Sequence, residues 1–298
     1  FRMFRTLLIT CLLIQLAPGQ GPKAGQDANL VQQLRQVYSG WRTAVVRKDA
    51  VSWQRFTSSN RLTSIKNRLL SERRRFPQAF FNLPASPPDL NTLKALRVRV
   101  KGPTVKAIYF GKVDFGIGGK PTENILTVSY VQERTGWKYE GSEFINLNAL
   151  PDVRKQIQAG DYKYVDQPAF QPDGVIVKPG IALTGAAQYI AKAYVYCPGR
   201  EVNLVVNKIS PHTFQNTKQA EIILGGARDG NNELRFTVKD IPGGDPKSPM
   251  TIRVYLMSQV QGVKPIKALE YQVTDGKAPE KSGLRRFIVT PEMAKKLR

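Results

Sequence analysis

Apolar side chains in the first part of the chain recur every three or four residues, which is the spacing of an amphipathic helix. This stripe covers residues 28–47 and predicts a helix with Asp27 at its N-terminal cap. Asp49 stands where it can cap a short second helix. A third helix is expected over 62–75, because Pro77 cannot continue it. Three helices are therefore expected before residue 77.

Beyond Pro88 the apolar period shortens to two, which is typical of strands with one buried face. Leu96, Val98 and Val100 alternate with three basic residues, so this strand is expected to have a basic outer face. Further strands are predicted at 104–116, 125–133 and 137–144, with a hairpin connection at 117–124 and a short helix at 152–158. Helices followed by antiparallel strands predict an α+β domain, with the helices packed on a curved antiparallel sheet.

Residues 159–174 contain two prolines and two glycines and show no clear period. We interpret them as a linker between the α+β domain, over 28–158, and a second domain over 175–298. Seven short strands separated by turn residues are predicted in the second domain, at 188–197, 202–209, 219–224, 233–241, 250–260, 267–273 and 284–289. Such a series is typical of an antiparallel β-sandwich, of the general immunoglobulin-like kind but without its Cys…Trp…Cys pattern.

Residues 1–19 show the three-part pattern of a secretory signal peptide. A short basic start is followed by an apolar run over 7–16 and then by small residues with a proline. The run is too short to cross a bilayer, whose core needs about 20 residues. Cleavage is expected between Gly19 and Ala28. The sequence therefore predicts an exported protein, periplasmic or extracellular, with no transmembrane segment in the mature chain.

Few residues carry the marks of catalytic or metal chemistry. Without residues 1–19, Cys197 has no partner for an internal disulfide, and its place in an alternating apolar run predicts a buried, inert thiol. The only histidine, His212, follows a proline and is interpreted as a turn residue, since no spacing around it suits zinc or a Ser-His-Asp triad. No metal and no cofactor are expected.

Two glycine-containing stretches resemble ligand-binding motifs and are better explained as turns. The stretch FGIGGK at 115–120 is followed by a proline and flanked by strands, whereas a phosphate loop leads into a helix. The stretch RDGNNE at 228–233 spaces its acids like the start of a calcium loop but lacks the late bidentate acid. Both are predicted to be hairpin connections.

Three features of the first half resemble those of a known superfamily. They are the amphipathic first helix, the stretch RKDAVSWQRFTSSNR at 47–61 and the stretch ERTGWKYEG at 133–141. With them, residues 28–147 resemble the nuclear transport factor 2-like superfamily of cone-shaped α+β proteins. The resemblance implies a curved sheet wrapped around the first helix, with a hollow between them. Some members of that superfamily are enzymes that use Asp, Tyr or His in the hollow, and many only bind or scaffold. This half of the chain contains no histidine.

Five aromatic residues are candidates for lining the hollow and binding a small ligand. They are Tyr38, Trp41, Tyr109, Tyr130 and Trp137. The alternative is that these side chains only form the core between helix and sheet. A second alternative is catalysis in the hollow, with Asp114 as base and Tyr109 or Tyr130 as proton donor, if Asp114 shares an inward face with Ile108 and Phe110. Glu143 is the other candidate carboxylate, and a plain surface role remains open for both.

Charge favours anionic partners, because 45 Lys+Arg against 23 Asp+Glu give a net charge of +22. Two basic groups are candidate polyanion contacts: Arg73, Arg74 and Arg75 at the end of the third helix, and Arg97, Arg99 and Lys101 on the first strand. The phenylalanine-rich loop at 76–89 is expected to cover the hollow. Export and the even spread of charge both argue against nucleic acid.

These observations lead to one main hypothesis and two alternatives. The main hypothesis is an exported, non-enzymatic binding or scaffold protein of a bacterial-type cell envelope. Its partner would be an anionic envelope component, lipid or glycan, or another envelope protein. The alternatives are a small-molecule enzyme that uses the hollow, and a binder of polyanions such as glycan or nucleic acid.

Overall fold

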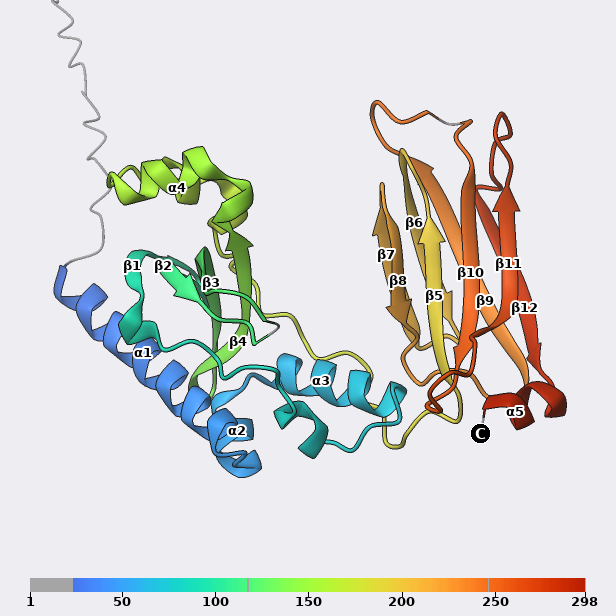
Figure 1. The fold of residues 1–298 in the computed structure, drawn as a ribbon, viewed down its shortest axis with the longest axis horizontal. Helices are drawn as coiled ribbons and strands as arrows, with labels where there is room; N and C mark the ends of the chain where they lie inside the picture. Colours follow the sequence, from blue (N-terminus) through green and yellow to red (C-terminus); the bar gives the residue numbers. More distant parts are fainter. Residues whose placement is uncertain (1–23, 117, 246, 298) are drawn as a thin grey trace, which may run out of the picture.

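The computed structural model describes residues 24–116, 118–245 and 247–297. The predicted signal peptide at residues 1–19 lies outside these ranges. The described chain is mostly β, with three antiparallel four-stranded sheets and few helices. Figure 1 shows the first sheet with most of the helices in one half, and the second and third sheets in the other. Each half has core clusters of its own, and the cores do not merge.

Among the described residues, three α-helices precede the first sheet, as the periodicity predicts. They are α1 (Ala24–Val46), α2 (Ala50–Phe56) and α3 (Ser59–Ser71). The predicted cap at Asp49 is confirmed, because its carboxylate accepts hydrogen bonds from the backbone N–H groups of Val51 and Ser52. The predicted cap at Asp27 is wrong, since α1 begins before it and includes it.

The third helix ends earlier than the sequence predicts. Its C-terminal cap is Glu72, and Arg73 adopts a positive φ of 55°. The three consecutive arginines therefore follow the helix instead of forming its last turn. The segment after them returns to the core, where the rings of Phe80 and Phe81 lie 4.4 and 5.6 Å from that of Trp53. These phenylalanines pack on α2 and α3, and residues 83–88 lie nearer the hollow.

The first sheet has the order β1-β2-β3-β4 and helices on both faces. Its strands are β1 (Lys94–Lys101), β2 (Thr104–Val113), β3 (Thr122–Glu133) and β4 (Gly136–Asn146). One face packs on α1, through Val105, Ala107 and Tyr109 of β2. The other packs on α4 (Pro151–Gln158) and on two short 3-10 helices, Lys163–Asp166 and Pro168–Phe170.

A register shift between Ala95 and Arg97 changes the faces of β1. Leu96 therefore joins the cluster under α4, whereas Val98 packs with the cluster under α1. The prediction that these two residues share one face is wrong for this reason. The predicted basic outer face is also partly covered, because Asp166 pairs with both Arg97 and Arg99.

The predicted linker at 159–174 is structured in its first part. Val165 and Phe170 are 0 % and 4 % exposed and belong to the cluster under α4. These residues are part of the first half. The extended connection to the second half therefore starts after Phe170 and reaches Tyr189, which already belongs to the second core.

The second half contains eight strands, one more than predicted, in the orders β11-β10-β5-β8 and β12-β9-β6-β7. The strands are β5 (Ile190–Tyr196), β6 (Arg200–Val206), β7 (Ser210–Gln215), β8 (Lys218–Ile222), β9 (Gly230–Asp240), β10 (Met250–Met257), β11 (Ile266–Val273) and β12 (Ser282–Val289), followed by α5 (Pro291–Leu297). One core cluster draws on both sheets. Cys197 is buried and free within it, as predicted.

The missed strand is β7, which contains His212. The sequence suggested a turn there because Pro211 interrupts the run. In the structure Pro211 lies on the exposed side of an edge strand, where a proline costs no ladder hydrogen bond. Ser210, His212 and Phe214 alternate inward.

The end of α3 joins the two halves through hydrogen bonds. The side chain of Asn67 donates to Ile181 O (2.6 Å) and accepts from Leu183 N (2.9 Å). Ser71 Oγ accepts from Gly225 N (2.9 Å). Asn67 and Ser71 are 4 % and 0 % exposed, so both polar side chains are buried at this junction. The junction fixes α3 beside the edge of the second half, as Figure 1 shows.

Replacing Phe170 with alanine tests whether this segment belongs to the first half. The chain has three tryptophans, Trp41, Trp53 and Trp137, all in the first half, so tryptophan fluorescence reports its unfolding. We expect Phe170→Ala to lower its free energy of unfolding in urea by about 3–5 kcal/mol, because a buried ring is lost. Val175→Ala is the control, since Val175 is 68 % exposed. Equal stability of the two variants would contradict the assignment.

Candidate functional site

The face of the first sheet under α1 brings four of the five predicted aromatic residues together. Tyr38 and Trp41 come from α1, Tyr109 from β2 and Tyr130 from β3. Tyr139 of β4, which the sequence analysis missed, completes the group. All five are at most 6 % exposed. Alternation along β4 was the available signal, because Tyr139 lies two residues after Trp137.

These rings fill the deep part of the expected hollow. Trp41 stacks on Tyr139 with ring centroids 3.9 Å apart and an interplanar angle of 24°. Tyr38 lies 5.5 Å from Trp41 and 6.1 Å from Tyr139. Such offset and edge contacts stabilise aromatic clusters beyond the burial of their area. The alternative of a packed core is therefore right for the interior of the first half.

The polar atoms of this aromatic layer differ in whether they have partners. Tyr38 OH donates to Pro88 O (2.9 Å), and the hydroxyls of Tyr139 and Ser142 lie 2.8 Å apart. Tyr130 OH and Trp41 Nε1 are buried without a hydrogen-bond partner among the described residues. Buried donors of this kind are uncommon, since leaving one unpaired costs about 1–3 kcal/mol.

Burial also sets the protonation of the tyrosines. Burial raises the pKa of Tyr38, Tyr130 and Tyr139, and the neighbouring phenols raise it further for Tyr38 and Tyr130. Burial raises the pKa of Tyr109 as well, although Arg35 acts in the opposite direction. All four hydroxyls therefore keep their protons at neutral pH. They can offer hydrogen bonds but are poorly suited to act as bases.

An apolar pocket of about 240 Å³ opens at the edge of this layer, between α1, the end of β2, β4 and the proline-rich loop 83–88. Its lining includes the rings of Tyr38, Trp41, Phe115, Tyr139 and Phe144. Two hydrogen bonds hold the loop over α1: Tyr38 OH to Pro88 O, and Arg42 Nε to Pro87 O (2.8 Å). We call this the mouth pocket.

The candidate carboxylates lie in positions that do not favour acid–base catalysis. Asp114 lines the mouth pocket but is exposed, and its Oδ1 accepts from Gly116 N (2.8 Å) in a turn. The expected shared inward face is wrong, because Ile108 and Phe110 belong to the cluster on the opposite side of the sheet. Glu143 is exposed. Neither carboxylate approaches the buried position that a tuned catalytic base needs.

Of the five predicted aromatic residues, Tyr38 and Trp41 line the mouth pocket, Tyr109 and Tyr130 lie in the buried layer, and Trp137 is in neither place. It is half-buried near the β3–β4 turn and lines a separate cavity of about 590 Å³ with Val37 and Phe56. Trp137 is the second residue of β4, so it lies at the rim of the aromatic layer under α1. We therefore replace it by Tyr139 in the candidate site.

The two basic groups proposed as polyanion contacts are engaged within the chain to different degrees. Arg97 and Arg99 pair with Asp166, and the Arg97 guanidinium lies 4.9 Å from the ring centroid of Tyr162. Arg74 pairs with Glu72 at 3.4 Å. Arg73, Arg75 and Lys101 are exposed. The six residues lie in two places, on β1 and after α3, and do not form one continuous contact surface.

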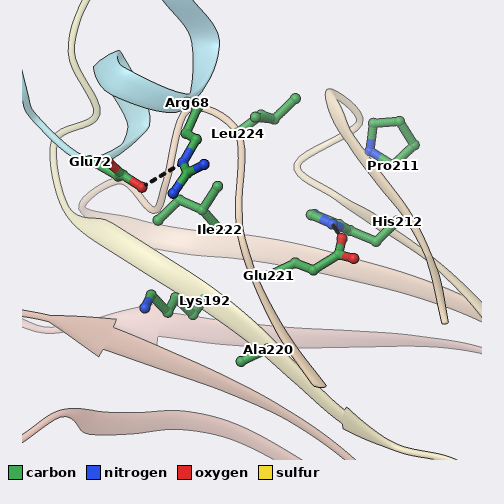
Figure 2. A pocket seen from close by; sticks show the side chains of 9 residues that line it. All are labelled: Arg68, Glu72, Lys192, Pro211, His212, Ala220, Glu221, Ile222 and Leu224. Carbon is green, nitrogen blue, oxygen red and sulfur yellow. Dashed lines mark hydrogen bonds and ion pairs between the residues drawn. The ribbon is translucent and has the colours of Figure 1, made fainter. Parts of the chain in front are cut away.

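A polar cluster that was not predicted from the sequence lies in the second half, beside α3. His212 Nδ1 lies 2.7 Å from Glu221 Oε2, and His212 Nε2 lies 2.7 Å from Ser210 Oγ. Ser210 Oγ also accepts from Leu224 N (2.7 Å). His212 and Glu221 face a cleft of about 430 Å³ whose far wall is Arg68 and Glu72 of α3 (Figure 2).

This cluster has the donor order of a hydrolytic triad but lacks access to its serine. With Nδ1–H donated to Glu221, Nε2 accepts from the Ser210 hydroxyl, as in a Ser-His-acid arrangement. Ser210 is 0 % exposed and does not line the cleft. A nucleophile must reach its substrate, so we assign the three residues a structural role that ties β7 to β8.

Comparison with family models, with curated proteins and with solved structures gives no match for this chain. None of the helices in the described ranges is both long and apolar enough to cross a membrane. The same ranges hold no cluster of three or more His, Cys, Asp or Glu side chains that could bind a metal ion. The geometry of the chain itself therefore carries the functional proposals.

Phenylalanine substitutions test the two kinds of buried hydroxyl. Tyr139→Phe removes a hydrogen bond to Ser142 and should lower the free energy of unfolding by about 0.5–1.5 kcal/mol. Tyr130→Phe removes a buried hydroxyl that has no partner in the described structure, so stability should be unchanged or higher. Urea unfolding followed by tryptophan fluorescence measures both. An equal loss in the two variants would show that Tyr130 OH has a partner.

Proposed function

We propose that this is an exported, non-enzymatic binding protein of a cell envelope, and that the mouth pocket holds a small, mainly apolar ligand. In this proposal the first half is a cone-like α+β domain of the nuclear transport factor 2-like kind. The second half is an immunoglobulin-like β-sandwich. The aromatic layer between α1 and the sheet supports the first assignment, and the single core between two antiparallel sheets supports the second.

The observation that carries the ligand proposal is the environment of Trp41. Its ring lines the mouth pocket and stacks on Tyr139, whereas its Nε1 is buried and closed to a ligand. Five aromatic rings in the lining provide apolar contact, and Ser142 provides a hydroxyl. An apolar concavity with a few placed polar groups is typical of small-molecule sites. The fitting ligand is a flat apolar or aromatic molecule with one hydrogen-bond acceptor.

Enzymatic use of the same site is less well supported. Asp114 is the acid in the lining, and it is exposed and held in a turn. The neighbouring tyrosines keep their protons because burial raises their pKa. A reaction in this pocket would lack a base poised near neutral pH. Binding without turnover fits these groups better.

The envelope location and the anionic partner remain proposals based on charge and on the pattern of residues 1–19. The net charge of +22 attracts anionic lipid or glycan weakly and in a salt-dependent way. The pairing of Arg97 and Arg99 with Asp166 weakens the case for a dedicated polyanion site. Recruitment to an envelope surface or to another envelope protein is therefore favoured over tight polyanion binding.

Replacing Trp41 with phenylalanine tests the pocket. Isothermal titration calorimetry with 2-naphthol, a flat aromatic probe with one oxygen, should give saturable binding to the unaltered protein. Trp41→Phe replaces the indole with a smaller ring and removes part of the apolar wall of the pocket, so the Kd should rise by about 2–10-fold. Trp137→Phe is the matched control, because Trp137 lies outside the mouth pocket, and its Kd should be unchanged. No saturable binding, or equal effects in both variants, would refute the site.

Expression of the full chain in a bacterium tests export. We expect the protein in the periplasm or the medium, with intact mass showing a cut between Gly19 and Ala28. Leu12→Arg places a charge in the apolar run and should retain the uncut chain in the cytoplasm. An uncut chain in the cytoplasm without this substitution would contradict the proposal.

A further inference from the structure

Strand β8 lies at the edge of the second sheet. The strand order places it next to β5, and no other strand of the described residues pairs with it, so one side of its backbone is free of strand partners there. An exposed strand edge presents a row of N–H and C=O groups that can pair with another extended chain. The ladder with β5 shows which residues of β8 present these groups.

The residues of odd number turn their backbone groups toward β5. Cys197 N donates to Thr217 O and Ile223 N donates to Ala191 O, both at 2.9 Å. In an antiparallel ladder the bonded residues alternate with residues whose backbone groups face away. Lys218, Ala220 and Ile222 therefore direct their N–H and C=O groups to the free side. Leu224 follows the same rule, because its N–H leaves β5 and binds Ser210 Oγ.

Open space lies along this free side. The cleft of about 430 Å³ is lined by Ala220, Ile222 and Leu224 on the β8 side and by Arg68 and Glu72 of α3 on the other. Figure 2 shows the side chain of Arg68 extending from α3 toward Ile222 at one side of the cleft, with His212 and Glu221 at the other. The junction between the halves holds α3 at this distance, so the cleft is a fixed groove beside a strand edge.

The neighbouring edge strand is protected, whereas β8 is open at its centre. Strand β7 ends the third sheet on the same side. Its Pro211 has no N–H and lies on the exposed side, which is a common protection of edges. The central residue of β8 is Ala220, which is small, uncharged and exposed. An added strand would therefore meet the β8 edge without steric hindrance from that residue.

The charges around the groove indicate an acidic partner. Glu72 pairs with Arg68 and Arg74, and Glu221 binds His212, so both acids are engaged within the chain. Lys192, in the lining, makes no ion pair among the described residues. It lies on β5 opposite Ile222 in the ladder, so a strand added beyond β8 would be two strand spacings away, about 9.6 Å. The extended lysine side chain and a glutamate side chain of the added strand can span this distance together.

We propose that the β8 edge binds an extended, acidic peptide segment of a partner protein as an additional antiparallel or parallel strand. Lys218, Ala220 and Ile222 supply the backbone hydrogen bonds, and Lys192 pairs with an acidic side chain of the segment. Arg68 on α3, which is paired with Glu72, forms part of the opposite wall of the groove. Strand addition of this kind takes its affinity from the main chain and its selectivity from side chains. The site is separate from the mouth pocket and does not depend on it.

Fluorescence anisotropy with a short fluorescein-labelled peptide in which glutamate and valine alternate tests the proposal. Ala220→Pro removes one outward N–H at an edge position that tolerates proline, and it should raise the Kd at least about tenfold. Thr213→Pro makes the same change on the free side of β7 and should leave the Kd unchanged. Thermal unfolding should show that both variants are folded. Unaltered binding to Ala220→Pro would overturn the proposal.

Two further binding measurements test whether the bound segment must be acidic. A peptide with glutamine in place of glutamate should bind more weakly, and Lys192→Met should lose about 2–5-fold in affinity for the glutamate peptide but not for the glutamine peptide. Equal binding of the two peptides would refute an acidic partner. Sedimentation should show a monomer, because self-association abolished by Ala220→Pro would assign this edge to a second copy of the chain and overturn the proposal.

Discussion

The buried layer of tyrosine and tryptophan rings between α1 and the first sheet is the constraint on which the first half depends. Rings of this size stabilise a small domain strongly, but each brings a polar atom that must be accommodated. The fold satisfies Tyr38 by drawing Pro88 over α1 and satisfies Tyr139 with Ser142. The first of these bonds holds a proline-rich loop above the rings, and the mouth pocket lies beneath that loop. The proposed site is thus a consequence of how the buried tyrosine hydroxyls obtain their hydrogen bonds.

A second constraint acts where the two halves meet. Asn67 and Ser71 are buried on α3. The side chain of Asn67 binds backbone groups of the connection between the halves, and that of Ser71 binds a backbone N–H of the second half. Buried polar groups of this kind fix geometry, because any other arrangement would leave them unpaired. The end of α3 is therefore held beside strand β8. The groove that we assign to an extended peptide exists because these contacts fix the distance.

Local patterns predicted the helices and most strands, and long-range contacts decided the rest. The stripe of α1 and the cap at Asp49 are local, so they could be read from the sequence. The faces of β1 could not, because a bulge reversed them. The engagement of Arg97 by Asp166 and of His212 by Glu221 joins residues far apart in the chain or on different strands. The burial of single residues was predictable where it followed from the alternation of apolar and polar positions in a strand, as for Cys197.

The most direct test of the central claim is the NMR signal of the Trp41 indole N–H. The chain has three tryptophans, so a 15N-labelled sample gives three indole resonances, which single Trp→Phe variants assign. Addition of 2-naphthol should move the Trp41 resonance with saturation, because the naphthyl ring would lie against the Trp41 indole, while the resonances of Trp53 and Trp137 stay in place. A Trp41 resonance that does not respond, or three resonances that move together, would contradict a ligand site at this ring.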